Sequence, residues 1–179
     1  MSQTITTDLR YPIGKYEAKP FSETQRDEWL ADIKFLPQLL ENALVNLDES
    51  QLQTPYREGG WTVQQLVHHI ADSHMNGYIR CKLSLTEENP SLKTYEEKVW
   101  ATLKDVANVP VNISITLLYA LHTRWYAALS DLPLQDWHRK AFHPGQNKEV
   151  SLWYLLGTYA WHGKHHVAHI TSLRERNDW

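Results

Sequence analysis

Apolar side chains recur every three or four positions over most of the chain, and strand-like alternation is almost absent. This period is typical of amphipathic helices. Ser22 followed by Gln25 is a capping-box pattern, which predicts that a helix begins there. We expect this helix to extend from about residue 23 to 47 and to kink at Pro37, which cannot donate a backbone hydrogen bond.

A second capping-box pattern, Thr62 with Gln65, follows a pair of glycines that indicates a turn. It predicts a long helix over residues 63–85. The next segment lies between Pro90 and Pro110, and its charges have no clean period. We therefore expect one short helix there, with loops at both ends.

The second half of the chain predicts two more long helices. Apolar positions return at helical spacing over residues 113–129, and Ser151 begins a helix that we expect to end at about Arg174. The loop between them, residues 131–150, is longer than a plain helix connection, so we expect it to cover part of the structure. The sequence thus predicts an all-α four-helix bundle, with a short extra helix and a long loop before the last helix, in a single domain over residues 1–179.

Composition narrows the classes of function. The formal net charge is −3, and Lys and Arg are scattered along the chain, which argues against a nucleic-acid partner. No segment has about 18 uninterrupted apolar residues, and the first residues lack the apolar core of a signal peptide. We therefore expect a cytoplasmic protein that does not enter a membrane. The single cysteine, Cys81, has no internal disulfide partner and is expected to be a buried thiol.

The segment WHGKHHVAHI, residues 161–170, places four histidines on the last predicted helix. On a helical wheel the apolar side chains of this helix form an arc about 120° wide. His166 lies inside this arc and His162 at its edge, whereas His169 lies slightly outside and His165 points well away. His162 and His166 therefore form the one pair at i, i+4 spacing whose rings both face the interior. Such a pair can hold a metal ion from one side.

A third ligand would have to come from another helix, and the predicted helix over 63–85 contains three histidines. The wheel places His68 opposite the apolar stripe, where we expect it to be solvated. His69 flanks the stripe and His74 lies within it. Periodicity therefore leaves His69 and His74 as alternatives, and it favours His74 for burial.

The segments GGWTVQQLVHHIADSHMN and YAWHGKHHVAHI resemble the DinB-like superfamily, as do YPIGKYE, TPYREGGW and LSLTEENP. Within that superfamily the chain most resembles the YfiT-like proteins of bacilli, which are described as metal-dependent hydrolases. The resemblance implies a four-helix bundle with one divalent metal ion, zinc or nickel, on three histidines that match His69, His162 and His166. For the first ligand the resemblance, and not the wheel, selects His69 over His74. It also implies a homodimer.

Three neutral histidines leave coordination positions open for water or substrate, whereas structural sites usually close with four protein ligands. Our first hypothesis is a hydrolase that attacks a small-molecule substrate with metal-activated water. The superfamily also includes bacillithiol and mycothiol S-transferases, so the alternative is transfer of a low-molecular-weight thiol held by the metal. A second alternative is a non-catalytic metal-binding stress protein. The sequence has no HExxH motif and does not identify a general base.

We expect supporting roles for the remaining histidines. His165 and His169 are predicted to be bystanders or to support the ligands. His74 is predicted to be a hydrogen-bonded residue of the core or of a pocket wall. His143 lies in the predicted loop, where a turn explains its presence as well as a functional role does.

One carboxylate and three indoles also lie close to the candidate ligands in the sequence. Asp72, one turn after His69, could orient an imidazole through its second nitrogen, although an exposed helix carboxylate is the more common case. Trp61, Trp153 and Trp161 could line a pocket, and core packing is the usual role of such rings.

Overall fold

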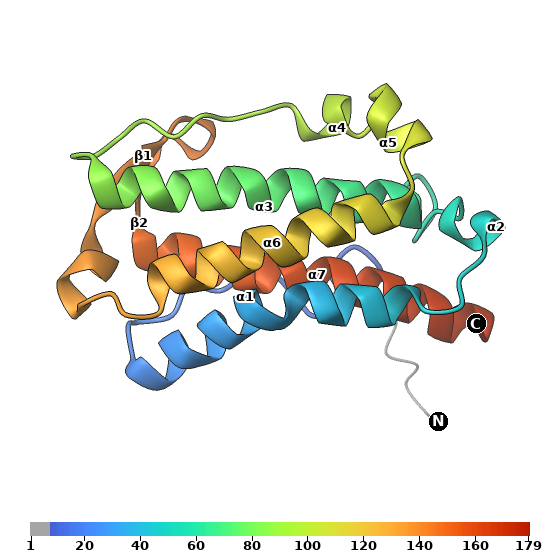
Figure 1. The fold of residues 1–179 in the computed structure, drawn as a ribbon, viewed down its shortest axis with the longest axis horizontal. Helices are drawn as coiled ribbons and strands as arrows, with labels where there is room; N and C mark the ends of the chain where they lie inside the picture. The colour runs from blue at the N-terminus through green and yellow to red at the C-terminus, as the bar shows by residue number, and fades with distance from the viewer. Residues whose placement is uncertain (1–7) are drawn as a thin grey trace.

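A computed structural model describes residues 8–179 of the chain. Its four long helices are α1 (Glu23–Leu44), α3 (Val63–Thr86), α6 (Val111–Leu129) and α7 (Leu152–Asn177). Helix α1 contacts α6 and α7, and α3 contacts the same two helices, so α1 and α3 lie diagonally opposite (Figure 1). The predicted all-α four-helix bundle is confirmed.

The order of the helices requires a long crossover. Figure 1 shows that α1 and α7 run in one direction and that α3 and α6 run in the opposite direction. Because α3 and α6 are parallel neighbours, the chain between them must return along the whole bundle. This crossover contains two short helices, α4 (Glu97–Trp100) and α5 (Lys104–Asn108), where the sequence predicted one. They are separate because Leu103 has an extended backbone conformation.

The first long helix ends earlier than predicted. It stops at Leu44 because Val45 leaves the helical region and Asn46 adopts a left-handed conformation with φ of 63°. Asparagine tolerates this conformation better than most residues. A one-turn helix, α2 (Glu49–Leu52), follows before α3. Pro37 lies inside α1 and is buried.

The segment over residues 131–150 is not a plain loop, so that prediction was incomplete. It contains two 3-10 helices, η1 (Leu134–His138) and η2 (Pro144–Gln146), and an antiparallel hairpin of β1 (Lys140–His143) and β2 (Lys148–Ser151), with η2 between the two strands. Phe142 also exchanges backbone hydrogen bonds with Pro90 and Leu92 of the crossover. These non-local bonds explain why helical periodicity did not reveal the hairpin. As predicted, the segment covers part of the core, since Trp137 and Ala141 are fully buried.

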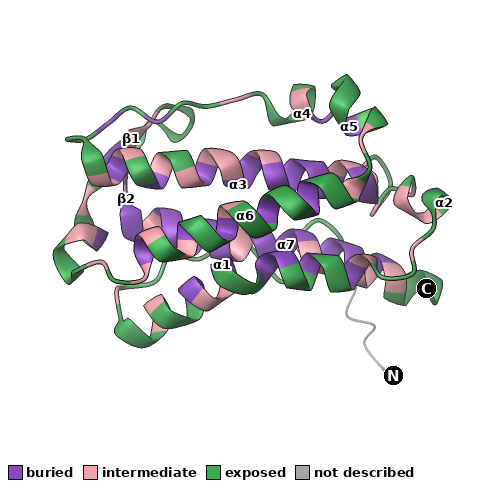
Figure 2. Cartoon of the chain, in the orientation of Figure 1, coloured by how far each residue is buried: buried purple, intermediate pink, exposed green. Residues whose placement is uncertain are grey.

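The buried residues lie along the inner sides of the four long helices (Figure 2). The apolar ones form two regions. One is rich in tryptophan and lies near the hairpin; the other is aliphatic and includes Leu36, Leu66 and Ile70. Trp153 belongs to the first region, where its ring centroid lies 4.3 Å from that of Trp29, so it packs in the core. Buried histidines contact both regions and make part of the interior polar. His74 lies beside Trp125 of the first region, and His69 lies beside Trp61, which packs against the second.

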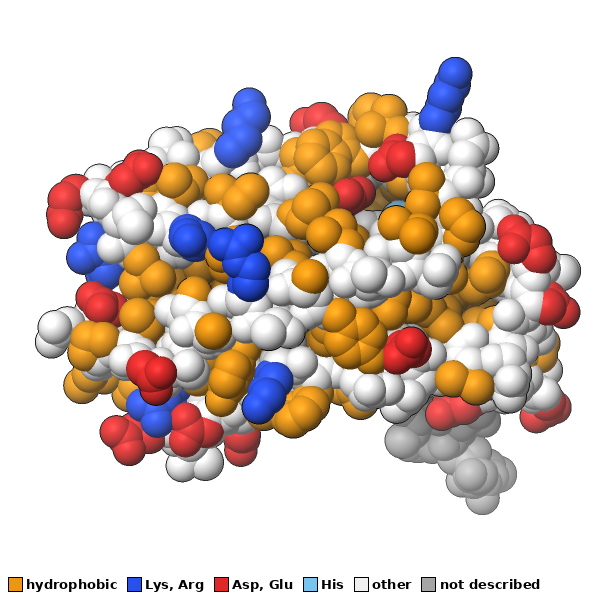
Figure 3. Space-filling model, viewed as in Figure 1, with side chains coloured by type: hydrophobic (Ala, Val, Ile, Leu, Met, Phe, Trp, Pro, Cys, Tyr) orange, Lys and Arg blue, Asp and Glu red, His pale blue; other side chains and the backbone are white. Residues whose placement is uncertain are grey.

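The outer face of α6 and α1 carries exposed apolar side chains (Figure 3). They include Phe35 and Leu39 on α1 and Ile113 and Leu117 on α6. Acidic and basic side chains are interspersed on this face, with no basic stripe. Among the helices of residues 8–179, none combines the length and the apolar character needed to cross a membrane.

Candidate metal centre

Three histidines from two helices converge at one point in the bundle. Nε2 of His162 on α7 lies 3.2 Å from Nε2 of His69 on α3. The same atom lies 3.2 Å from Nε2 of His166, one turn further along α7. One ring nitrogen from each of the three lies within 4.8 Å of the others. The structure therefore brings together the three residues that the resemblance selected.

The spacing of these nitrogens fits a shared metal ion. Two nitrogens at about 2.0–2.1 Å from a tetrahedral ion lie about 3.3 Å apart, close to the separations observed here. A neutral imidazole has one N–H group. Each ring can therefore donate a hydrogen bond to at most one of the nearby nitrogen atoms. A single cation would satisfy all three lone pairs. An all-imidazole donor set suits zinc, nickel, iron or copper.

The environment keeps these rings in the neutral form that binds metal. Burial lowers the pKa of His69 to about 4. Burial, reinforced by the neighbouring histidines, lowers the pKa of His162 and of His166 well below the usual range. At neutral pH these rings therefore do not need to lose a proton before a metal ion binds.

Nδ1 of His162 has a partner in the core. It lies 3.1 Å from Nε2 of His74, which is completely buried. Nδ1 of His74 lies in turn 3.0 Å from Nε2 of His122 on α6. His122 then hydrogen-bonds through Nδ1 to the backbone oxygen of Ile33 on α1. The predicted role of His74 as a hydrogen-bonded core residue is confirmed, and the chain of bonds touches all four long helices.

His122 was not among the residues predicted from the sequence, although the sequence contains a signal for it. His122 follows Leu118 by four residues and precedes Trp125 by three, so it lies on the apolar stripe of α6. A histidine at such a position needs a hydrogen-bonding partner inside the protein.

The three histidines lie at the edge of an open cleft of about 560 Å³. Of the two roles left open for them, Trp61 and Trp161 have that of lining the cleft, and the Trp61 ring lies 4.6 Å from that of His69. Charged side chains enter the cleft from the α2–α3 connection and from α4: Arg57, Glu97 and Lys98. Sequence periodicity could not find them, because they reach the site through turns and through the crossover.

Two of the histidines are not where the helical wheel placed them. His68 was predicted to be solvated, but it is buried and hydrogen-bonds to Ser114 Oγ at 2.8 Å and to the Val109 oxygen at 3.0 Å. His165 was predicted to point away from the core, but it is buried beneath Trp161, with ring centroids 4.4 Å apart. Segments outside the helix also cover faces that look polar on the isolated helix: the crossover lies over His68, and the ring of Tyr11 lies 5.9 Å from that of His165.

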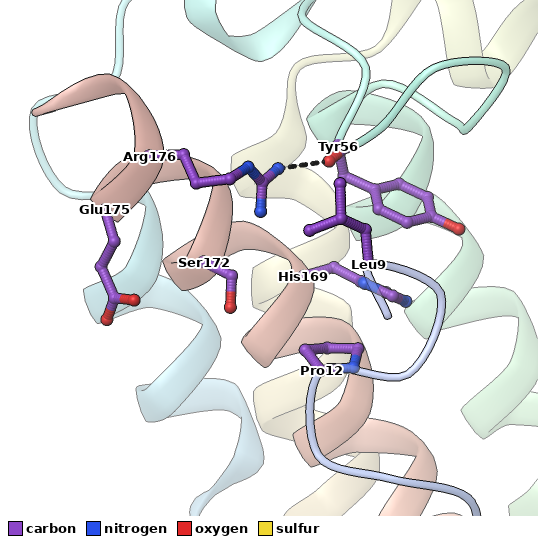
Figure 4. A pocket seen from close by; sticks show the side chains of 7 residues that line it. All are labelled: Leu9, Pro12, Tyr56, His169, Ser172, Glu175 and Arg176. Atoms are coloured by element: carbon purple, nitrogen blue, oxygen red, sulfur yellow. Dashed lines mark hydrogen bonds between the residues drawn. The ribbon is translucent and has the colours of Figure 1, made fainter. Parts of the chain in front are cut away.

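His165 and His169 form a second close pair in the same cleft, with their Nε2 atoms 3.0 Å apart. Burial lowers the pKa of His165 to about 4 and that of His169 to about 3. His169 also borders a smaller hollow of about 180 Å³, shown in Figure 4. There Arg176 donates a hydrogen bond of 2.6 Å to the backbone oxygen of Tyr56. The pair thus lies between the candidate metal centre and this hollow.

Two other candidates lie apart from the convergence point. Asp72 is half-buried, contrary to the exposed position expected for it, and burial raises its pKa to about 6. Among residues 8–179 it makes no hydrogen bond to His69, so it does not orient that ring. His143 lies on β1 and is not among the residues that line the cleft.

The sequence pattern of the DinB superfamily matches residues 32–170, and the chain therefore belongs to this superfamily. A Bacillus cereus protein named "Putative metal-dependent hydrolase" is 51% identical over 173 residues, covering 96% of this chain and 99% of the relative. A Bacillus thuringiensis protein with a similar name has the same identity and coverage. The solved structure of YfiT from Bacillus subtilis, described as a probable metal-dependent hydrolase with an unusual four-helix bundle topology, superposes with a TM-score of 0.93. The two chains share 48% sequence identity, and the superposition covers 96% of this chain and 98% of the YfiT chain.

Proposed function

We propose that this protein is a divalent-metal-dependent hydrolase in which His69, His162 and His166 hold one zinc or nickel ion. The observation that carries the proposal is the convergence of three neutral imidazole nitrogens at the edge of an open cleft. Three protein ligands leave room for water and substrate, as in catalytic zinc sites. The names of the relatives agree with this assignment.

A divalent ion bound there supplies Lewis-acid activation of water. The remaining chemistry belongs to the side chains of the cleft. Glu97 is the one carboxylate among the described residues that line it, and we assign it the role of accepting the proton of the attacking water. Arg57 and Lys98 line the same cleft and favour a substrate with an anionic group. The rings of Trp61 and Trp161 supply apolar walls for the rest of the substrate.

A thiol S-transferase is the second candidate, and the same site supports it. A metal ion also lowers the pKa of a coordinated thiol, which makes the sulfur a better nucleophile. Arg57 and Lys98 complement the carboxylates of a low-molecular-weight thiol such as bacillithiol. A non-catalytic metal-binding stress protein is less well supported, because such a role does not need a cleft beside an incomplete ligand set.

We also propose that the protein forms a homodimer. Phe35 and Leu39 of α1 and Ile113 and Leu117 of α6 are exposed on adjacent helices, where a second copy would cover them. Light scattering at micromolar concentration should give twice the mass of one chain. A mass of one chain would remove this part of the proposal.

The test separates the two catalytic candidates. Zinc- or nickel-loaded protein is incubated with a panel of anionic esters and amides, and in parallel with a thiol-reactive electrophile, each with and without bacillithiol. A hydrolase turns over the first panel regardless of thiol, whereas a transferase consumes the electrophile only when thiol is present. The matched control is His166→Ala, which should be inactive in both assays. No turnover in either assay by fully loaded protein would favour the non-catalytic alternative.

A further inference from the structure

Helix α1 contains a buried hydrogen-bond acceptor that its own backbone leaves free. In an α-helix the oxygen of Ile33 accepts from the N–H group of the residue four positions later. That residue is Pro37, which has no N–H group. Ile33 and His122 are each only 1% exposed, so water does not reach the oxygen easily, and His122 Nδ1 takes the place of the missing donor.

This contact fixes the protons of three histidines in turn. A carbonyl oxygen can only accept, so His122 must carry its hydrogen on Nδ1, and its Nε2 is then bare in the neutral ring. His74 must therefore donate from Nδ1 to His122, which leaves its own Nε2 bare. By the same rule His162 must donate from Nδ1 to His74. The bare Nε2 of His162 is then the atom that faces His69 and His166.

This order of protons requires the three rings to be neutral. Burial lowers the pKa of His122 to about 4, and among residues 8–179 none of the three histidines pairs with a carboxylate. His74 is completely buried and has both nitrogens bonded, so it cannot turn without breaking two hydrogen bonds. One arrangement of protons therefore satisfies every member of the chain.

We propose that His122 and His74 are positioning residues that hold His162 in the single tautomer able to bind metal through Nε2, with the oxygen freed by Pro37 as their anchor. The proposal rests on the metal site proposed above. Because the chain ends on a carbonyl oxygen, which takes up no proton, it orients the ligand and does not carry protons away from the site. The opposite tautomer of His162 would place a hydrogen atom among the three ligand nitrogens.

The direct test needs no substitution. In the metal-free wild-type protein with 15N-labelled histidine, NMR should show that His162 carries its hydrogen on Nδ1 and none on Nε2. An Nε2–H tautomer, or a mixture of the two, would overturn the inference. This readout does not depend on metal binding. If wild type bound no zinc, the proposed function would fail while the tautomer measurement would still decide the present inference.

Variants then test the effect on metal binding. His122→Phe keeps a ring but removes both hydrogen bonds, and the zinc affinity should fall about 10- to 100-fold, the usual effect of losing a group that orients a ligand. His122→Gln, whose amide oxygen can accept from His74, should recover most of the loss. His68→Phe is the matched control, because His68 is also a buried residue with two hydrogen bonds. Unchanged zinc affinity in a folded His122→Phe protein, or an equal loss in the control, would contradict the proposal.

Discussion

Nε2 of His69 on α3 lies 3.2 Å from Nε2 of His162 on α7, although 93 residues separate them in the chain. The two rings meet only because α3 and α7 pack against each other in one register. The candidate metal centre is therefore a product of helix packing, and changes at the helix interfaces should alter it without touching a ligand.

One such interface lies directly beside the ligands. A Cβ atom added at Gly163 would lie 2.6 Å from Cδ2 of Leu36, a buried residue of α1. Gly163→Ala should therefore push α7 away from α1 and destabilise the protein by about 1–3 kcal/mol, as overpacked cores usually do. Thermal unfolding checks this, with a decrease in Tm of roughly 2–4 °C for each kcal/mol.

The control for this variant is Gly145→Ala in the hairpin, where the added Cβ would meet the methyl group of Thr94 at 3.2 Å. Thr94 is exposed and can move, so the Tm should stay close to the wild-type value. A Gly163→Ala protein as stable as wild type would show that α1 and α7 pack less closely than described.

The buried histidines should make the stability of the metal-free protein depend on pH. Burial lowers the pKa values of His69, His122 and His165 to about 4, from 6.5 in an unfolded chain. Between pH 6.5 and 4 the unfolded chain therefore binds more protons than the folded protein, so the free energy of unfolding falls as the pH is lowered through this window. Above about pH 7.5 the rings are neutral in both states and contribute no pH dependence.

Urea unfolding at pH 7.5, 6 and 5 checks this prediction. The midpoint should already be lower at pH 6 than at pH 7.5, because pH 6 lies inside this window, and it should fall further at pH 5. His165→Gln should show a shallower fall, because it lacks one of the titrating rings. A midpoint that stays constant down to pH 5 would contradict the burial of these histidines.

Glu97→Gln tests the assignment of the proton acceptor. Glu97 is not one of the three convergent residues, so the variant should bind metal with wild-type stoichiometry. Turnover of whichever substrate the panel yields should fall about 10²- to 10⁴-fold in kcat, the usual contribution of a general base. Lys98→Met, the neighbouring change in the same cleft, should instead raise KM. Wild-type kcat in Glu97→Gln would remove this residue from the mechanism.

The periodicity of the sequence predicted part of this site for a sound physical reason. His162 and His166 share one helix with a clear apolar arc, so the direction of their rings follows from helix geometry alone. The same method failed for His68 and His165. The crossover next to α5 covers the first, and Tyr11 from the segment before α1 lies beside the second, with ring centroids 5.9 Å apart. A helical wheel contains no information about segments that pack over it from elsewhere in the chain.

The sequence predicted the fold, like the site, only in part. The N-cap patterns at Ser22 and Thr62 and the apolar periods of the long helices predicted the four-helix bundle, since these signals are local. The hairpin over residues 140–151 depends on bonds between Phe142 and the crossover, which no local pattern reports. The general-base candidate Glu97 reaches the cleft through the same crossover and was missed for the same reason.

The central claim is that three histidines hold one metal ion, and elemental analysis of purified protein tests it most directly. After reconstitution with zinc or nickel, wild type should contain about one equivalent of metal per chain, as expected for one site. His69→Ala, His162→Ala and His166→Ala should each lose it. His165→Ala, a buried histidine of the same cleft, should keep it. Metal retained in His166→Ala, or no metal in reconstituted wild type, would contradict the account.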